Sequence, residues 1–149
     1  MLSVGVNIMR KIVYLHLEKG KISQVILEEC SRYSTLVEPR GEQGVLLDLS
    51  TFKRAGEIVK ELAVFIYRQN VGPARLGIAS NPLVAFCATC GSIPPVQVKI
   101  KNTYRFHSYY NILIFQVIPG QEASFLAGLP LQEFPVLSAK ERQKLIRLG

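Results

Sequence analysis

The sequence contains no tryptophan and is poor in cysteine, histidine and acidic residues. Its 149 residues include three cysteines, two histidines and 11 Asp or Glu against 18 Lys or Arg, which gives a net charge of +7. Three cysteines predict no disulfide framework and favour a reducing compartment such as the cytoplasm. The excess of basic residues favours a polyanionic partner without identifying it.

Long apolar runs are also missing. The longest one, at residues 111–118, is interrupted by Gln116 and is much shorter than the roughly 20 residues of a membrane-spanning helix. The first residues lack the basic and apolar regions of a secretory signal, and both Met1 and Met9 stay open as the start. We therefore expect a cytoplasmic protein without a membrane partner.

What the sequence does contain is enough apolar material for a core. Hydrophobic residues make up 48% of the chain and charged residues 19%, a balance that excludes a disordered or low-complexity chain. The length is that of one domain. We therefore expect residues 1–149 to form a single domain.

Strand and helix patterns alternate along the chain. A β-branched run predicts a strand at residues 12–17, and Ser23 is placed to cap a helix whose apolar positions continue to Tyr33. The other predicted strands are at residues 36–38, 45–49, 74–79, 96–101 and 112–118, and the other predicted helices are at 57–68, 82–90, 121–126 and from Ser138 onward. This mixture predicts an α/β (α+β) fold with a single ferredoxin-like, palm-type sheet and helices mainly on one face.

Four segments, taken in order, carry a resemblance to one family. They are SRYSTLVEP leading into VLLDLS at residues 31–50, ARLGIASNPLVA at 74–85, VIPGQEASFLAGLPL at 117–131, and the end of the chain from residue 139. Together they resemble the palm of the Y-family translesion DNA polymerases, the UmuC-like proteins, and of their catalytically degenerate ImuB-type relatives. The resemblance implies one palm-like domain, in which residues 138–149 are similar to the start of the family's thumb.

The sequence departs from this family where the family binds metal. Active members hold two metal ions with carboxylates, but the family's Asp-Glu pair aligns with Gln43 and Gly44, and neither is a good ligand for Mg²⁺. On the first strand, His16 and Glu18 stand near the family's Asp-x-Asp pattern. The catalytic candidates left are Asp48, Glu18 and, with a one-residue shift, Glu42, and the metal candidates are His16, Glu18 and Asp48.

Other parts of a polymerase are missing as well. Too few residues separate Glu18 from Asp48 to hold the family's fingers segment, and Pro82 and Phe86 replace two lysines that the resemblance places near an incoming triphosphate. The resemblance therefore implies a non-catalytic palm domain without a cofactor. The alternative is a residual metal-dependent nucleotidyltransferase, and only that alternative requires Mg²⁺.

Basic and aromatic residues interleave in the second half of the chain, around His107, which we expect in a loop. Cations beside aromatic rings suit contacts with phosphates and bases. The alternatives are that the tyrosines pack on a sheet or on a second subunit, and that the basic positions near the end form a solvated helix face. The nucleic-acid-binding candidates are Lys99, Lys101, Tyr104, Arg105, Lys140, Arg142, Lys144 and Arg147.

These features lead to one expected function and two alternatives. We expect a DNA-binding or protein-interaction module in DNA repair, and the alternatives are the residual nucleotidyltransferase and a purely structural assembly domain. The expected partners are DNA, a second copy of the chain in a homo-oligomer, or a DNA-repair protein. Protein partners are expected because a palm without its neighbouring domains exposes the surface that those domains cover, and large apolar surfaces mark interfaces.

Overall fold

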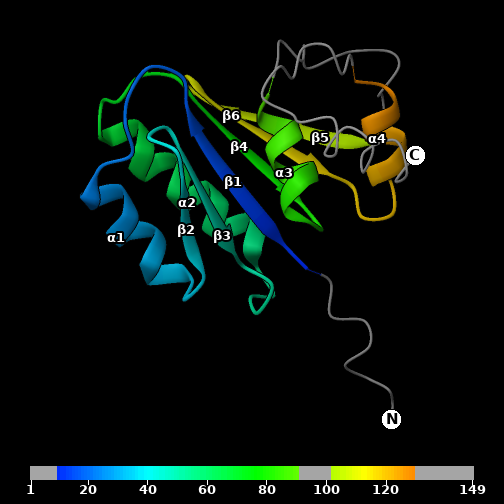
Figure 1. Cartoon of the computed structure of the whole chain (residues 1–149), viewed down its shortest axis with the longest axis horizontal. Helices are drawn as coiled ribbons and strands as arrows, with labels where there is room; N and C mark the ends of the chain where they lie inside the picture. The colour runs from blue at the N-terminus through cyan, green and yellow to red at the C-terminus, as the bar shows by residue number, and fades with distance from the viewer. Residues whose placement is uncertain (1–9, 91–101, 130–149) are drawn as a thin grey trace.

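The computed structural model describes residues 10–90 and 102–129 (Figure 1). The predicted strand at 96–101 and the predicted helix from Ser138 lie outside these residues. The described strands are β1 (Ile12–Leu17), β2 (Val37–Arg40), β3 (Gly44–Asp48), β4 (Ala74–Ala79), β5 (Tyr104–Tyr109) and β6 (Ile112–Val117). The described helices are α1 (Gln24–Tyr33), α2 (Ala55–Arg68), α3 (Pro82–Thr89) and α4 (Glu122–Ala127).

The described strands form one mixed sheet in the order β2-β3-β1-β4-β6-β5. Strand β1 is antiparallel to both β3 and β4, and β2 is antiparallel to β3. With α1 between β1 and β2 and α2 between β3 and β4, this is the βαββαβ arrangement of a ferredoxin-like fold. The predicted single ferredoxin-like sheet is therefore confirmed, and β6, parallel to β4, and β5, antiparallel to β6, extend it at one edge.

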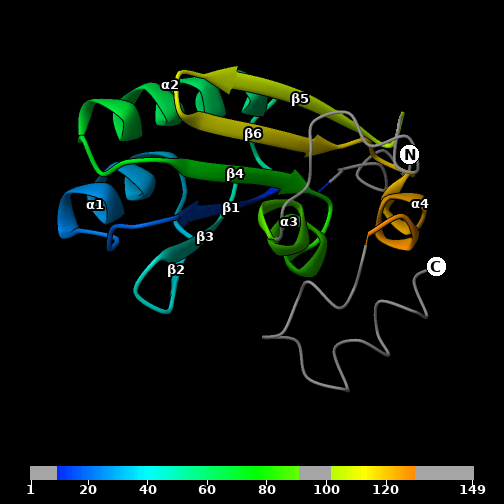
Figure 2. The same ribbon diagram turned by 90° about the horizontal axis from the view of Figure 1, so that it is seen from above.

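Each face of the sheet has its own hydrophobic core, because successive residues of a strand point to opposite faces. On the α2 face, α1 and α2 pack against Val13 and Leu15 of β1. On the α3 face, α3 and α4 pack with Ile12 and Tyr14. Figures 1 and 2 show α2 and α3 on opposite sides of the sheet. The two longer helices share one face and the two shorter ones pack on the other, so the described helices are divided between the faces, whereas we expected them mainly on one.

The helices begin where their capping residues predict. The Ser23 side chain accepts a hydrogen bond from the Ile26 N–H at 3.2 Å, and the Asn81 side chain accepts one from the Val84 N–H at 2.9 Å. Helix α3 sits close to β4 because residue 77 of β4 is a glycine: a Cβ there would overlap the Ala85 carbonyl oxygen. This contact holds α3 over the sheet.

Strand β5 is the main element that the sequence pattern does not predict. Among the described strands it is an edge strand paired only with β6, so several of its residues stay exposed and its apolar alternation is weak. His107 therefore lies on a strand and not in a loop as expected. None of the helices in the described part of the chain has the length and apolar character needed to cross a membrane.

Candidate functional site

The first candidate site is the part of β1 and β3 to which the sequence resemblance assigns the metal-ligand positions. The strand register places His16 directly opposite Gly44 on β3 and opposite Arg75 on β4. Opposite residues of paired strands share a face of the sheet, so these positions lie together on the α3 face. They offer an imidazole, no side chain and a guanidinium, where a two-metal site needs carboxylates.

A carboxylate at position 44 is also excluded by its surroundings. A Cβ on Gly44 would overlap the Tyr14 hydroxyl and would lie 2.8 Å from the Arg40 carbonyl oxygen. The Tyr14 side chain is buried and meets Phe86 edge-on, with ring centroids 5.1 Å apart. Burial raises the pKa of the Tyr14 hydroxyl. Tyr14 therefore fills the space in which a metal ligand of β3 would stand.

The acidic candidates beside His16 are held in ion pairs. Glu18 accepts a hydrogen bond from Arg75 Nε at 2.9 Å, and their side chains are 35% and 17% exposed. Glu42 lies 3.6 Å from the Lys21 ammonium, at the surface. Burial lowers the pKa of His16, which keeps its imidazole neutral at pH 7. The two carboxylates therefore neutralise cations of the chain.

The third acidic candidate, Asp48, lies at the other end of β1. It pairs with Ile12, four residues from His16, which is about 13 Å along a strand. Its carboxylate accepts hydrogen bonds from the N–H and the hydroxyl of Ser50. The metal candidates His16, Glu18 and Asp48 are thus not brought together, and the described residues contain no group of three potential metal ligands.

Strand β5 sends two of the predicted nucleic-acid candidates to opposite faces. The Tyr104 ring lies on the α3 face, 5.8 Å from the Phe125 ring, and packs against the core while staying partly exposed. Arg105 is exposed on the α2 face, opposite Gln116 of β6. The other candidates lie outside the described residues: Lys99, Lys101, Lys140, Arg142, Lys144 and Arg147.

Three tyrosines meet at the end of β5 on the α2 face. Tyr67, in the last turn of α2, stacks on Tyr110 with ring centroids 4.4 Å apart and meets Tyr109 edge-on at 5.6 Å. Tyr110 is 70% exposed and has a φ of 55°, a backbone conformation that bulky residues rarely adopt. The turn between β5 and β6 therefore presents this ring to solvent in spite of a conformational cost.

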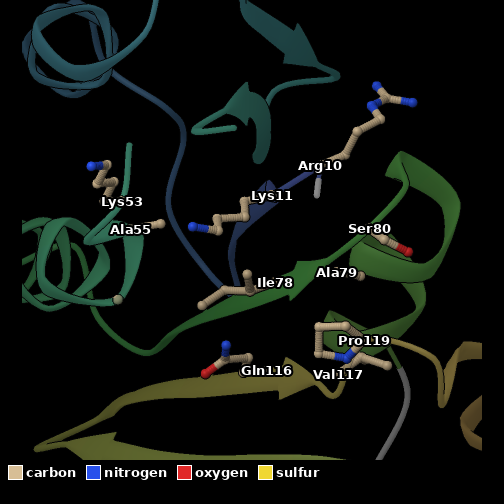
Figure 3. A pocket seen from close by; sticks show the side chains of 11 residues that line it. Arg10, Lys11, Lys53, Ala55, Ile78, Ala79, Ser80, Gln116, Val117 and Pro119 are labelled. Carbon is tan, nitrogen blue, oxygen red and sulfur yellow. The ribbon is translucent and has the colours of Figure 1, made fainter. Parts of the chain in front are cut away.

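A basic pocket lies at the other end of α2 (Figure 3). It has a volume of about 190 Å³ and is lined by the cationic residues Arg10, Lys11 and Lys53. None of its lining residues, all in the described part of the chain, is acidic. Gln116 also lines the pocket, and its cross-strand partner is Arg105. Arg105 therefore adds a cation on β5, directly opposite a residue that lines the pocket.

The pocket and the tyrosines form a two-part feature of the α2 face, at opposite ends of α2. Helix α2 has 14 residues and is thus about 21 Å long, with the pocket at its first residue and Tyr67 in its last turn. Strand β5 links the two parts, because Arg105 lies opposite Gln116 of the pocket and Tyr109 contacts Tyr67. We call this feature the basic-aromatic surface, which consists of Lys11, Lys53, Arg105, Tyr67, Tyr109 and Tyr110.

Sequence reasoning identified Arg105 but missed Lys11, Lys53 and Tyr67. The two lysines precede β1 and α2, and only the pairing of distant strands brings them to one pocket, so no local pattern could show it. Tyr67 did carry a signal, since it lies seven residues after the exposed Lys60 and hence on the solvent side of α2.

Comparisons with protein-family models, curated protein sequences and solved structures give no match to this chain. The likeness to the Y family therefore rests only on the four sequence segments given above and on the residues that they align with the family's motifs. The ferredoxin-like topology does not by itself identify a function, because this fold carries many unrelated activities. The function is therefore argued from the two surfaces described above.

Proposed function

We propose that this chain is a non-catalytic, palm-like domain that binds single-stranded nucleic acid through its basic-aromatic surface. The observation that carries the proposal is that Lys11, Lys53 and Arg105 share the α2 face with exposed tyrosines, the two groups lying at opposite ends of α2. Single-strand-binding proteins combine cations that track phosphates with rings on which bases stack. The resemblance to the Y family supports a place for this binding in DNA repair.

The exposed tyrosines favour single strands over duplexes. A ring can stack only on a base whose face is free, and in a duplex each base face is covered by its neighbours. Tyr110 offers such a ring at the tip of the β5–β6 turn, with Tyr67 stacked behind it. The strained backbone of Tyr110 supports a functional role, because strain tends to persist where the side chain is needed.

The residues at the former metal site support the non-catalytic part of the proposal. Gly44 and His16 occupy the aligned positions, Tyr14 fills the space beside them, and Glu18 pairs with Arg75. Asp48, the remaining carboxylate of β3, is bonded to Ser50. We therefore expect no nucleotide incorporation in a primer-extension assay with Mg²⁺ or Mn²⁺.

The experiment is the binding of a labelled single-stranded oligonucleotide, followed by fluorescence anisotropy as the salt concentration is varied. We expect binding at low salt that weakens linearly on a log-log plot, and about a tenfold loss of affinity in Tyr110→Asn because one stacked base is worth roughly 1–3 kcal/mol. Leu36→Asn is the matched control, since Leu36 is 65% exposed but lies directly before β2, away from the basic-aromatic surface. No binding at low salt, or equal losses in both variants, would overturn the proposal.

A further inference from the structure

The basic pocket occupies a place where mixed sheets commonly bind ligands. It lies at the carboxyl ends of the parallel strands β4 and β6. Its volume of about 190 Å³ is below the roughly 300 Å³ at which pockets begin to hold drug-sized ligands. A small charged group therefore suits it better than a whole nucleotide. Ala55 and Gly56, the first residues of α2, also line it, and the start of a helix adds partial positive charge.

Hydrogen-bond donors of Lys11 and Gln116 lie at this volume, and Lys53 lines its edge with its ammonium turned outward. In Figure 3 the Lys11 side chain extends towards Ala55, the Gln116 side chain lies across the pocket, and the Arg10 side chain points away. The Lys11 ammonium donates a hydrogen bond to the Phe52 carbonyl oxygen at 2.9 Å. Because an ammonium has three protons, this bond fixes Lys11 in place and leaves donors for a ligand.

Carboxylates on the neighbouring elements have partners of their own. Glu57, in the first turn of α2, lies 3.7 Å from Arg54. Glu122 accepts hydrogen bonds from the Ser80 hydroxyl and the Gly120 N–H. Although partial burial acts to raise the pKa of Glu122, these bonds lower it below its ordinary value. Glu122 therefore keeps its negative charge near Ser80. The described residues that line the pocket include the cations Arg10, Lys11 and Lys53 and no carboxylate, which favours an anion.

We propose that this pocket binds the terminal phosphate of a nucleic-acid strand. The inference rests on the proposed function, because a strand stacked on the tyrosines reaches the pocket by way of Arg105, whose cross-strand partner Gln116 lines it. A terminal phosphomonoester carries about −1.5 to −2 charges at pH 7 and three acceptor oxygens. An internal phosphodiester carries one charge and has two ester arms, which a small pocket excludes.

The test uses the full chain and three probes: inorganic phosphate, a single-stranded oligonucleotide with a phosphate at one end, and the same oligonucleotide without it. We expect inorganic phosphate to shift the backbone amide NMR signals of Gly56 and Gln116. The phosphorylated oligonucleotide should bind about tenfold more tightly than the other, because hydrogen bonds to a charged group are worth about that factor or more. Both possible ends are tested in separate oligonucleotides.

Two lysine variants localise the effect. Lys53→Met should remove most of the tenfold preference, whereas Lys19→Met should keep it, because Lys19 is equally exposed but follows the opposite end of β1. Circular dichroism establishes that both variants are folded. Equal binding of the phosphorylated and unphosphorylated oligonucleotides, or a preference that survives in Lys53→Met, would overturn the inference while leaving the proposed function in place.

Inorganic phosphate separates the failure of this inference from the failure of the proposed function. If phosphate leaves the signals of Gly56 and Gln116 unchanged, the pocket is not a phosphate site, whatever the affinity for DNA. If phosphate binds there but no oligonucleotide binds at low salt, the proposed function fails, and the assignment of the pocket to a nucleic-acid end fails with it.

Discussion

The two ends of β1 differ in how their charges are paired. At the end of His16, Arg75 pairs with Glu18 and Lys21 pairs with Glu42. At the end of Lys11, the cations of the pocket and Arg105 have no carboxylate among the residues that line the pocket. At the His16 end the carboxylates pair with cations, whereas at the other end Asp48 and Glu122 are bonded to neutral groups and the cations of the pocket have no carboxylate among the described residues of its lining.

This difference reverses the arrangement that the Y-family resemblance implies. In that family, the end of the first strand that corresponds to Glu18 would hold the metal ions. Here that end is closed by Tyr14 and an ion pair, and the basic pocket lies at the other end, on the opposite face of the sheet. We infer that charge at the His16 end contributes to folding and that charge at the Lys11 end contributes to binding.

The largest expected effect is on DNA binding, in the double variant Lys53→Glu with Arg105→Glu. Replacing two cations of the basic-aromatic surface by carboxylates should lower the affinity for single-stranded DNA about 100-fold at low salt and flatten the salt dependence. Anisotropy titrations measure both. The control is Lys19→Glu with Lys21→Glu, which makes the same change of charge at the other end of β1. An equal loss in the control would mean that only net charge matters.

Two glycine substitutions compare the His16 end and the Lys11 end of β1 by the free energy of unfolding. Gly44→Ala should lower the free energy of unfolding by about 2 kcal/mol, because the new methyl group would press on the Tyr14 hydroxyl and the Arg40 carbonyl oxygen. Gly56→Ala should raise it by up to about 1 kcal/mol, since a Cβ there meets nothing within 4 Å and alanine favours the helix. Urea unfolding measures both values, and similar values would contradict the model of a closed His16 end.

At the His16 end of β1, the ion pair of Arg75 with Glu18 should contribute more to stability than the ion pair of Lys21 with Glu42. Arg75→Met leaves a partly buried Glu18 without its charged partner, and we expect a loss of about 1–2 kcal/mol. Lys21→Met should change the free energy of unfolding by less than about 0.5 kcal/mol, because the Lys21 and Glu42 side chains are 76% and 74% exposed. Urea titrations that rank the two variants in the opposite order would contradict this assignment.

The smallest expected effect is a pH dependence that arises from His16. Burial lowers its pKa in the folded protein below the ordinary value of 6.5, so the unfolded chain takes up the proton more readily. Stability should therefore be fully present above pH 6.5 and should fall as the pH drops towards the folded pKa. Urea unfolding between pH 5 and pH 8 should show a smaller fall in His16→Gln. An unchanged profile in this variant would mean that His16 is not the group responsible.

Much of the fold could be predicted from the sequence because its signals are local. The capping residues Ser23 and Asn81 and the β-branched runs mark the elements, and six of these elements determine a ferredoxin-like order. Strand β5 could not be predicted, because an edge strand with one neighbour has little apolar alternation. The pocket could not be predicted either, since Lys11 and Lys53 meet only through the pairing of β1 with β3 and β4.

The most direct test of the central claim is a map of backbone amide NMR shifts as single-stranded DNA is added to the full chain. We predict changes at Gly56, Arg105 and Tyr110, which lie along the basic-aromatic surface, and none at His16 and Glu18. Changes confined to His16 and Glu18, or no change at Arg105 at saturating DNA, would contradict the claim that the chain binds DNA at the Lys11 end of β1 and not at the His16 end.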